Sequence, residues 1–354
     1  MLGRLTKGVV FAICLWLGFK LIFLVDKLKL NLACPQQSMF KASLVTLVKP
    51  TTLTETTTVS LTYKATFTDY ATVTVSNCAR DSVSKLSHLI IPIAFGEVQL
   101  TKLIRGLRYW QGYPPCVATS REPSTTLVFL LSQGKTAESV TKIRDIYESL
   151  DPKVRSCFKG WDIVSASVPD HKDNHFDGSR SMFEALVSNS VGLGNMHYVF
   201  WMEPDTIPIR PNWLFALQQA TGGGGEEFWI KGSALRHTLN SLKVGRQYGR
   251  HFLYHINGNA IYNMARDQFP VFYQRKLLPY LERRGVSRFA FDTAIEKFLQ
   301  DEDNHSTWQA IAHRFHYTTI IQNRWRESLD VSAFSKSSPD TFLIHGSVPQ
   351  GDAP

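Results

Sequence analysis

The spacing of apolar and polar positions changes repeatedly along the chain from residue 99 to residue 299. Runs that are apolar on both faces, such as TLVFLL at Thr126–Leu131 and YVFWM at 198–202, predict buried strands. Helical spacing at 136–150 predicts an amphipathic helix between them. This alternation is typical of a mainly parallel sheet covered by helices on both faces. The same patterns predict strands at 161–166, 228–231 and 260–262, and helices at 99–110, 179–190, 264–284 (kinked at Pro270 and Pro279) and 293–299.

The N-terminus has a different pattern. Residues 8–25 are apolar except for Lys20, and as a helix they span ~27 Å, close to the hydrocarbon thickness of a bilayer. Arg4 and Lys7 precede this stretch, and no Ala-x-Ala-like cleavage site follows it directly. We therefore predict a cytosolic tail at 1–7 and a transmembrane signal anchor at 8–25. A cleaved signal peptide is the alternative.

Residues 26–86 are predicted to form a stem that precedes a globular domain at 87–354. The stem is rich in threonine between residues 51 and 74, which fits either an extended segment or two short β-strands. Beyond the anchor lie four cysteines, which would form two disulfides in any of three connectivities or remain as buried thiols. They are Cys34, Cys78, Cys116 and Cys157. A glycosylation sequon, Asn304-His305-Ser306, lies in a polar stretch predicted to be a loop.

Composition narrows the possible partners. With 354 residues, 44% of them hydrophobic and 19% charged, the chain has enough apolar content for a substantial core. The formal net charge of +9 is spread thinly, and neither zinc-finger spacing nor a basic helix followed by heptads is present. We therefore expect no nucleic-acid partner. A membrane surface or a nucleotide diphosphate remains compatible with the charge.

The most informative segment lies where the strand at 198–202 ends. Glu203-Pro204-Asp205 places two carboxylates just beyond the carboxyl end of a buried strand, where open α/β sheets bind ligands. Two acids held a residue apart by a proline suit a hard divalent cation, which would bridge the phosphates of a nucleotide sugar. A solvated turn is the alternative interpretation.

This strand and its acids resemble the DxD motif of GT-A glycosyltransferases. The EPD form is similar to that of plant and algal families such as hydroxyproline arabinosyltransferases, and the resemblance covers residues 126–346. It implies a GT-A fold, that is, a Rossmann-like mixed sheet flanked by helices, with Mn²⁺ or Mg²⁺ as cofactor. It also implies that Glu203 contacts the donor ribose or the metal and that Asp205 ligates the metal.

The same resemblance implies two further roles. His345 ends an apolar run and is expected to be an additional metal ligand, with His313 and His316 as rivals and a surface histidine as the alternative. Asp292 opens a predicted helix and is expected to be the general base of an inverting reaction. An ordinary helix cap is the other interpretation, and the two roles are compatible.

Other residues are expected near the donor and the acceptor. Ser132 and Gln133 follow a buried strand where a nucleotide pocket would begin, and Arg180 would pair with the diphosphate or remain solvated. The remaining candidates are expected to line the sugars, although a core tryptophan and a plain hairpin turn are the alternatives. They are Trp229, Lys231, Asn257, Gly258 and Asn259.

Together these features predict a single-pass type II membrane protein of the Golgi, or alternatively of the endoplasmic reticulum. Its luminal domain would transfer a sugar from a nucleotide sugar, with UDP-sugars favoured, to a hydroxyl of a glycan or glycoprotein. Two alternatives are a non-catalytic lectin-like or scaffolding relative and a nucleotidylyltransferase that makes nucleotide sugars. The anchor argues against the latter, and Ser132-Gln133-Gly134-Lys135 matches its Gly-rich loop poorly.

Overall fold

The structure is a computed structural model that divides into two compact units, residues 1–83 with 223–226 and residues 84–222 with 227–354. In the smaller unit, β1 (Thr58–Lys64) pairs antiparallel with β2 (Tyr70–Ser76). Of the two interpretations of the threonine-rich segment, the strands are therefore the one observed. The described residues are 58–64, 70–76, 85–94, 96–117, 122–174, 177–222, 227–236, 253–285 and 289–349.

The predicted anchor at 8–25 lies outside the described residues, as do Cys34 and Cys78. Within the described ranges, no helix has both the length and the apolar character needed to cross a bilayer. The larger unit begins near the predicted boundary at residue 87, since its first strand starts at Leu86.

A seven-stranded sheet forms the centre of the larger unit, with the order β10-β8-β9-β6-β3-β4-β5. β9 is antiparallel to both of its neighbours, and the other neighbouring strands of this sheet are parallel. The sheet is therefore mixed, as the GT-A resemblance implies. Its strands are β3 (Leu86–Ile93), β4 (Thr126–Leu131), β5 (Gly160–Ser165), β6 (Tyr198–Trp201), β8 (Ile230–Gly232), β9 (Ile261–Asn263) and β10 (Phe315–Tyr317).

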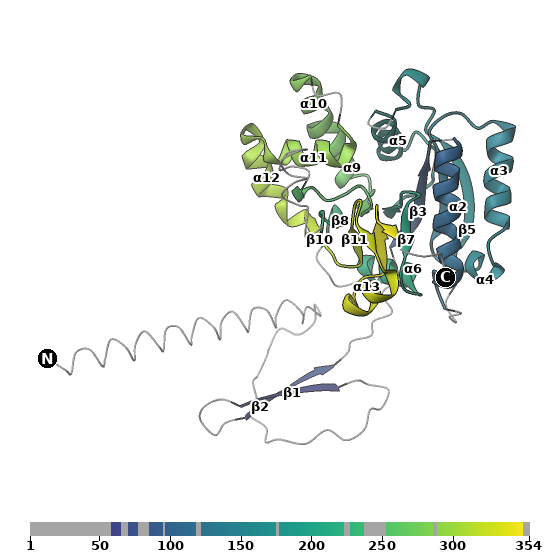
Figure 1. The fold of residues 1–354 in the computed structure, drawn as a ribbon. Coiled ribbons are helices and arrows are strands. Elements are labelled where there is room, and N and C mark those ends of the chain that lie inside the picture. The colour runs from purple at the N-terminus through teal and green to yellow at the C-terminus, as the bar shows by residue number, and fades with distance from the viewer. Residues whose placement is uncertain are drawn as a thin grey trace. The chain divides into compact units, whose positions relative to one another are not determined.

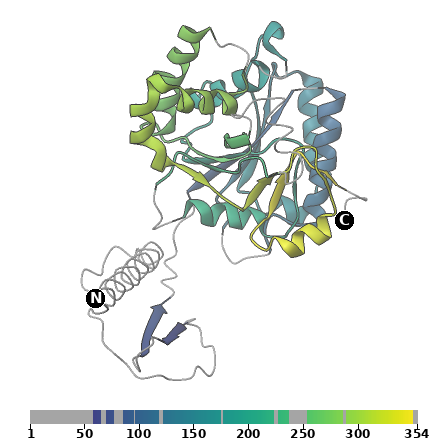
Figure 2. The ribbon, with the colours of Figure 1, turned by 60° about the vertical axis from the view of Figure 1, so that its left-hand side comes forward.

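Each face of the sheet has its own apolar core, because successive strand residues point to opposite faces. Leu89 and Ile91 pack into one core and Ile90 into the other. The first core takes in α2 (Glu97–Gly112), α3 (Ala137–Glu148), α4 (Pro152–Arg155) and α6 (Trp213–Thr221). The second takes in α5 (Asp177–Val187), α9 (Phe269–Phe272), α10 (Leu278–Arg284) and α11 (Phe291–Gln300). Figures 1 and 2 show these two helical layers around the sheet.

A smaller three-stranded sheet has the order β11-β13-β7, and its strand β7 is the next strand after β6 in the chain. Its strands are β7 (Thr206–Pro208), β11 (Ile321–Asn323) and β13 (Leu343–His345). This sheet brings the C-terminal part of the chain back to the segment that follows β6. The remaining elements are α12 (His305–Ile311), α13 (Val331–Ser337), the pair β12 (Ser328–Leu329) and β14 (Val348–Pro349), and 3₁₀ turns at Asp170–Lys172, Glu302–Asn304 and Ala312–Arg314.

Two sequence predictions need correction. The helix expected at 264–284 begins only at Phe269, where Pro270 occupies the first turn and its missing N–H costs no hydrogen bond. The helix continues through a π-helical turn at Tyr273–Leu277. Pro279 follows two residues after this turn and has no N–H to donate to it. The sequon is not in a loop: Asn304 ends a 3₁₀ turn before α12, and its Nδ2 donates to the Phe298 carbonyl at 3.0 Å.

A disulfide joins Cys116, which follows α2, to Cys157, which follows α4. This bond selects one pairing among those that the sequence leaves open. The bridge lies on the face of the sheet that α2 and α3 cover, where Cys157 is part of the buried core.

Candidate active site

The segment after β6 places two carboxylates at the carboxyl edge of the sheet. All four residues of β6 are buried, and the Met202 N–H still donates to the Ile90 carbonyl of β3 at 2.8 Å. The chain then turns, and the Thr206 N–H donates to the Glu203 carbonyl at 2.9 Å. Asp205 lies within this turn, so both acids project from a backbone that is fixed at each end.

His345 completes a cluster with these acids. Its Nε2 lies 2.8 Å from Glu203 Oε2 and 3.3 Å from Asp205 Oδ1. Strand β13 is antiparallel to β7 and sets Thr206 directly opposite His345. Of the rival histidines, His316 contacts the His313 carbonyl at 2.9 Å instead. The structure therefore brings together the three residues that the sequence analysis named as metal ligands.

The cluster has the composition and spacing of a divalent cation site. One ligand atom from each of the three residues lies within 4.8 Å of the other two. Ligands on opposite sides of an octahedral ion at ~2.1 Å stand ~4.2 Å apart, so small side-chain adjustments would suffice. Two carboxylates and an imidazole suit Mn²⁺, and Mg²⁺ less well because it prefers oxygen. The side chains of Glu203 and Asp205 are 31% and 23% exposed, which leaves room for a ligand.

The charges of the cluster depend on one another. Burial acts to raise the pKa of Asp205, but His345 and Lys102 hold it well below its usual range. Burial acts to lower the pKa of His345, but the carboxylates of Asp205 and Glu203 raise it to about 10. The imidazolium thus offsets part of the negative charge of the cluster in the metal-free protein. His345 Nδ1, which is buried, has no hydrogen-bond partner among the described residues.

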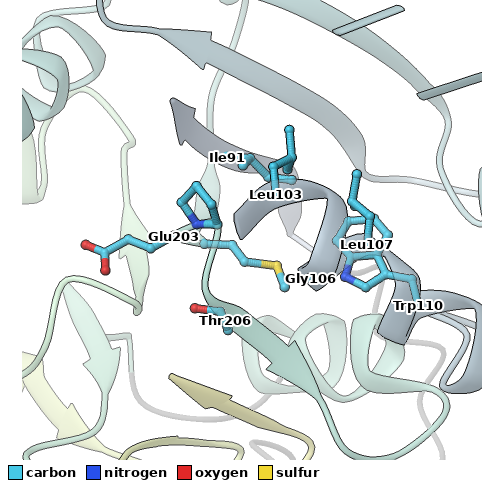
Figure 3. A pocket seen from close by; sticks show the side chains of 9 residues that line it. Ile91, Leu103, Gly106, Leu107, Trp110, Glu203 and Thr206 are labelled. Atoms are coloured by element: carbon cyan, nitrogen blue, oxygen red, sulfur yellow. The ribbon is translucent and has the colours of Figure 1, made fainter. Parts of the chain in front are cut away.

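Helix α2 packs against the turn at residues 203–206. A Cβ on Gly106 would come within 2.7 Å of the Pro204 carbonyl oxygen, so only glycine permits this close approach. From the same helix, Lys102 Nζ lies 3.5 Å from Asp205 Oδ2. The void between α2 and the turn measures about 10 Å³, which is room for one water molecule. Figure 3 shows the Glu203 carboxylate pointing away from this void.

Asp292 forms a second acidic group at the first turn of α11. Its Oδ2 accepts the Gly258 N–H at 2.9 Å and lies 3.3 Å from His255 Nε2. Its Oδ1 accepts the Thr293 N–H at 2.7 Å. Burial acts to raise the pKa of Asp292, but His255 and the two N–H donors lower it, so the carboxylate is ionised at neutral pH.

The segment 257–259 connects the two acidic groups. Gly258 donates its N–H to Asp292, while Asn259 Oδ1 accepts the Glu203 N–H at 2.7 Å. A Cβ on Gly258 would meet Phe291 at 3.0 Å and the Glu203 carboxylate at 3.5 Å. Tyr262, fully buried below, donates its hydroxyl to the Gly258 carbonyl at 2.9 Å. The glycine-bearing turn therefore lies between the two acidic groups, as an acceptor or donor loop would.

Ser132 and Gln133 follow β4 at the same edge of the sheet, because β3, β4, β5 and β6 run parallel. Ser132 is buried and donates its hydroxyl to Asp173 Oδ2 at 3.0 Å. Gln133 is exposed and donates to Asp170 Oδ1 at 3.2 Å. The topology thus places both at the edge that carries Glu203. Their contact with a donor remains a prediction.

Three other predicted residues contact the protein elsewhere. Arg180 Nε pairs with Glu184 Oε1 at 2.8 Å, one turn along α5. Trp229 packs against Phe272, with ring centroids 5.4 Å apart. Lys231 donates to the Ala220 carbonyl at 3.1 Å. The sugar and phosphate roles of these three residues remain predictions.

Sequence reasoning missed three residues that touch the acids. Lys102 reaches the site only through the packing of α2. Thr206 and His255 carried a local signal, since Thr206 directly follows Asp205 and His255 lies two residues before the turn at 257–259.

Comparisons with known proteins give only remote likenesses. No family model and no curated protein matches the chain. Similar solved structures include the galactosyltransferase LgtC with donor and acceptor sugar analogues (10% identity, 73% of this chain and 86% of that one, TM-score 0.42). Mouse xyloside xylosyltransferase 1 is similar too (12%, 73% and 97%, 0.41). A third is a mannosyltransferase of Pyrobaculum calidifontis with GDP-Man and Mn²⁺ (10%, 68% and 57%, 0.36). At these scores the assignment has to rest on the site residues themselves.

Proposed function

We propose that this chain is a metal-dependent glycosyltransferase that moves a sugar from a nucleotide-sugar donor to a hydroxyl group of an acceptor. The observation that carries the proposal is the joining of two acidic groups by a single short segment. Glu203, Asp205 and His345 make a cation site, and Asp292 stands ionised on the other side of residues 257–259. A metal-dependent transfer with inversion uses both a cation for the diphosphate and a base for the acceptor hydroxyl.

Glu203, Asp205 and His345 are the residues that would hold the ion, Mn²⁺ by preference or else Mg²⁺. When bound, such an ion supplies Lewis-acid stabilisation of the negative charge on the leaving diphosphate. The exposed fractions of the two acids leave them accessible to a donor. Ser132, Gln133 and Arg180 are proposed as donor contacts, with a UDP-sugar as the favoured donor.

Asp292 is proposed as the general base. Its carboxylate would take the proton of the acceptor hydroxyl while that oxygen bonds to the anomeric carbon. The bond from the anomeric carbon to the diphosphate breaks, and the electron pair leaves with the diphosphate. A single displacement of this kind inverts the anomeric configuration. His255, 3.3 Å from Asp292, orients the carboxylate and keeps it ionised before the reaction.

The acceptor is proposed to be a glycan or glycoprotein, with Trp229, Lys231, Asn257 and Gly258 on its side of the site. The setting is proposed to be the Golgi membrane, with the endoplasmic reticulum as the alternative. This part rests on the apolar stretch at 8–25 and on the disulfide Cys116–Cys157, which fits an oxidising compartment. Cleavage of a luminal reporter by an added protease, with and without detergent, would test the topology.

The function is tested by adding Mn²⁺ and a panel of UDP- and GDP-sugars to the full-length protein and measuring free nucleotide. Asp205→Asn tests the site, and Asp145→Asn, an exposed acid on α3, is the matched control. We expect metal-dependent release from one donor, lost in Asp205→Asn and retained in Asp145→Asn. Donor binding without release would support a lectin-like protein instead. Release of pyrophosphate from a nucleoside triphosphate, when a sugar 1-phosphate is supplied with it in a separate assay, would support a nucleotidylyltransferase.

A further inference from the structure

Asn259 lies beside the metal cluster, and its side-chain oxygen accepts two hydrogen bonds from the segment that carries the acids. The residue is 1% exposed. Its Oδ1 accepts the Glu203 N–H at 2.7 Å and the Thr206 hydroxyl at 2.7 Å. A buried side chain with this geometry cannot also contact a sugar, which is the role that the sequence analysis gave to Asn259.

The two hydrogen-bond donors, Glu203 and Thr206, are the residues on either side of the Pro204-Asp205 dipeptide. Fixing Glu203 and Thr206 to one oxygen therefore fixes the backbone that carries Asp205. Thr206 is also the strand partner of His345 across β7 and β13. A single amide oxygen thus holds, directly or through one neighbour, the backbone of all three metal ligands.

The orientation of the Asn259 amide is set by Asn257. Asn257 Oδ1 accepts both the Asn259 backbone N–H at 3.1 Å and the Asn259 Nδ2 at 2.9 Å. Turning the amide over would set its NH₂ group against the two donors from Glu203 and Thr206 and remove the contact with Asn257. The oxygen is therefore held toward the metal cluster before any ligand arrives.

We propose that Asn259 is a positioning residue that holds the three metal ligands in place before an ion binds. Through the preceding residue, Gly258, it also connects these ligands to the base. Gly258 donates its N–H to Asp292 at 2.9 Å, so consecutive residues hold the two halves of the site. The part that concerns the base rests on the proposed function. The part that concerns the ligands requires only that the cluster binds a divalent ion.

The test measures Mn²⁺ affinity of the full-length protein by electron paramagnetic resonance, without donor or turnover. Asn259→Ala is compared with Asn263→Ala, since Asn263 is equally buried and bonds Tyr198 and Ala265 rather than the cluster. Removing a partner that orients metal ligands typically costs 10- to 100-fold in affinity. We expect a loss of about tenfold or more for Asn259→Ala and none for Asn263→Ala at matched thermal stability.

Thr206→Val and Thr206→Ser provide a second route if Asn259→Ala does not fold. Valine removes the hydroxyl that Asn259 accepts, and serine retains it, so only valine should weaken Mn²⁺ binding, by less than Asn259→Ala. Unchanged Mn²⁺ affinity in folded Asn259→Ala or in Thr206→Val would overturn the proposal, as would a wild-type protein that binds no Mn²⁺. If wild type binds Mn²⁺ but transfers no sugar, the proposed function fails while the affinity comparison still decides the role of Asn259.

Discussion

Two Asp–His pairs in this molecule have the same separation and different surroundings. Asp205 lies 3.3 Å from His345 Nε2, and Asp292 lies 3.3 Å from His255 Nε2. The first pair shares its imidazole with a further carboxylate, Glu203, and no backbone N–H of another residue donates to Asp205 in the described contacts. In the second pair, Asp292 accepts two backbone N–H groups, those of Gly258 and Thr293.

This difference assigns the two aspartates to different chemistry. The Asp292 carboxylate accepts two backbone N–H groups and contacts one imidazole. These contacts keep it ionised and hold it in one orientation. Two carboxylates that converge on one imidazolium still leave one negative charge in excess, and a divalent cation would offset both carboxylates. The same pair of residue types therefore suits a base in one place and a metal site in the other. The predictions below test this division.

The largest effect is expected for Asp205→Asn. Loss of a ligand should abolish Mn²⁺ binding and lower sugar transfer by about 10³-fold or more, because an ion in this place supplies several kcal/mol. Activity and Mn²⁺ titrations on the same preparation measure both. Asp145→Asn is the control, and the division would be wrong if Asp205→Asn bound Mn²⁺ as well as the control does.

Asp292→Asn should be next. Removing a general base lowers kcat by about 10²- to 10³-fold, while Mn²⁺ affinity should stay within about twofold of wild type. Steady-state kinetics with saturating donor and a parallel Mn²⁺ titration separate the two effects. Loss of Mn²⁺ binding in this variant would place Asp292 in the metal site and remove the distinction between the pairs.

Mn²⁺ binding should depend on pH through His345. Because the neighbouring carboxylates raise the pKa of His345 to about 10, a metal ion has to displace a proton below that pH. The Kd should therefore fall by about tenfold per unit of rising pH between about pH 6.5 and pH 9, and His345→Gln should abolish this slope. Calorimetry at several pH values measures it, and an equal slope in the variant would contradict this account.

The same pKa shift predicts how the stability of the metal-free protein changes with pH. A raised pKa in the folded state means that the imidazolium contributes fully below its ordinary pKa of 6.5 and that the contribution is lost as pH rises through about 10. Thermal unfolding with EDTA should therefore show a decline in Tm toward high pH. The decline should be smaller in His345→Gln.

His255→Gln should have a moderate effect on rate and a clear effect on its pH dependence. His255 lowers the pKa of Asp292, so its removal should raise that pKa and move the acid limb of the rate–pH profile to higher pH. We expect a loss of about tenfold near neutrality with Mn²⁺ affinity unchanged. A profile that keeps its position despite the lower rate would mean that His255 acts only through packing.

The smallest effect is expected for Lys102→Met. The Lys102 side chain is 40% exposed and 3.5 Å from Asp205, and exposed ion pairs contribute ~0–1 kcal/mol. Tm should change little, and Mn²⁺ affinity should change by less than about fivefold. A much larger loss of donor binding with intact Mn²⁺ affinity would instead make Lys102 a diphosphate contact.

The sequence predicted the residues whose signals are local. Glu203 and Asp205 follow a strand that is apolar on both faces, and Asp292 opens an amphipathic helix, so each has its context within a few positions. His345 was placed by the resemblance to GT-A enzymes rather than by its neighbours. The structure brings it to the acids through the pairing of β13 with β7.

Other features depend on contacts between distant segments and left no local pattern. The antiparallel insertion of β9 and the small sheet of β7, β11 and β13 are decided by pairing partners that periodicity does not reveal. Asn259 was expected to line a sugar because GT-A enzymes have a glycine-bearing loop at this point of the chain. Its burial and its bonds to Glu203 and Thr206 exist only once β6 and β9 lie side by side.

The most direct test of the central claim is an electron paramagnetic resonance titration of Mn²⁺ into full-length wild type, Asp205→Asn and Asp292→Asn. The account predicts one bound ion in wild type and in Asp292→Asn, and none in Asp205→Asn. Absence of bound Mn²⁺ in wild type, or equal binding in all three proteins, would contradict the assignment of Glu203, Asp205 and His345 as the metal site.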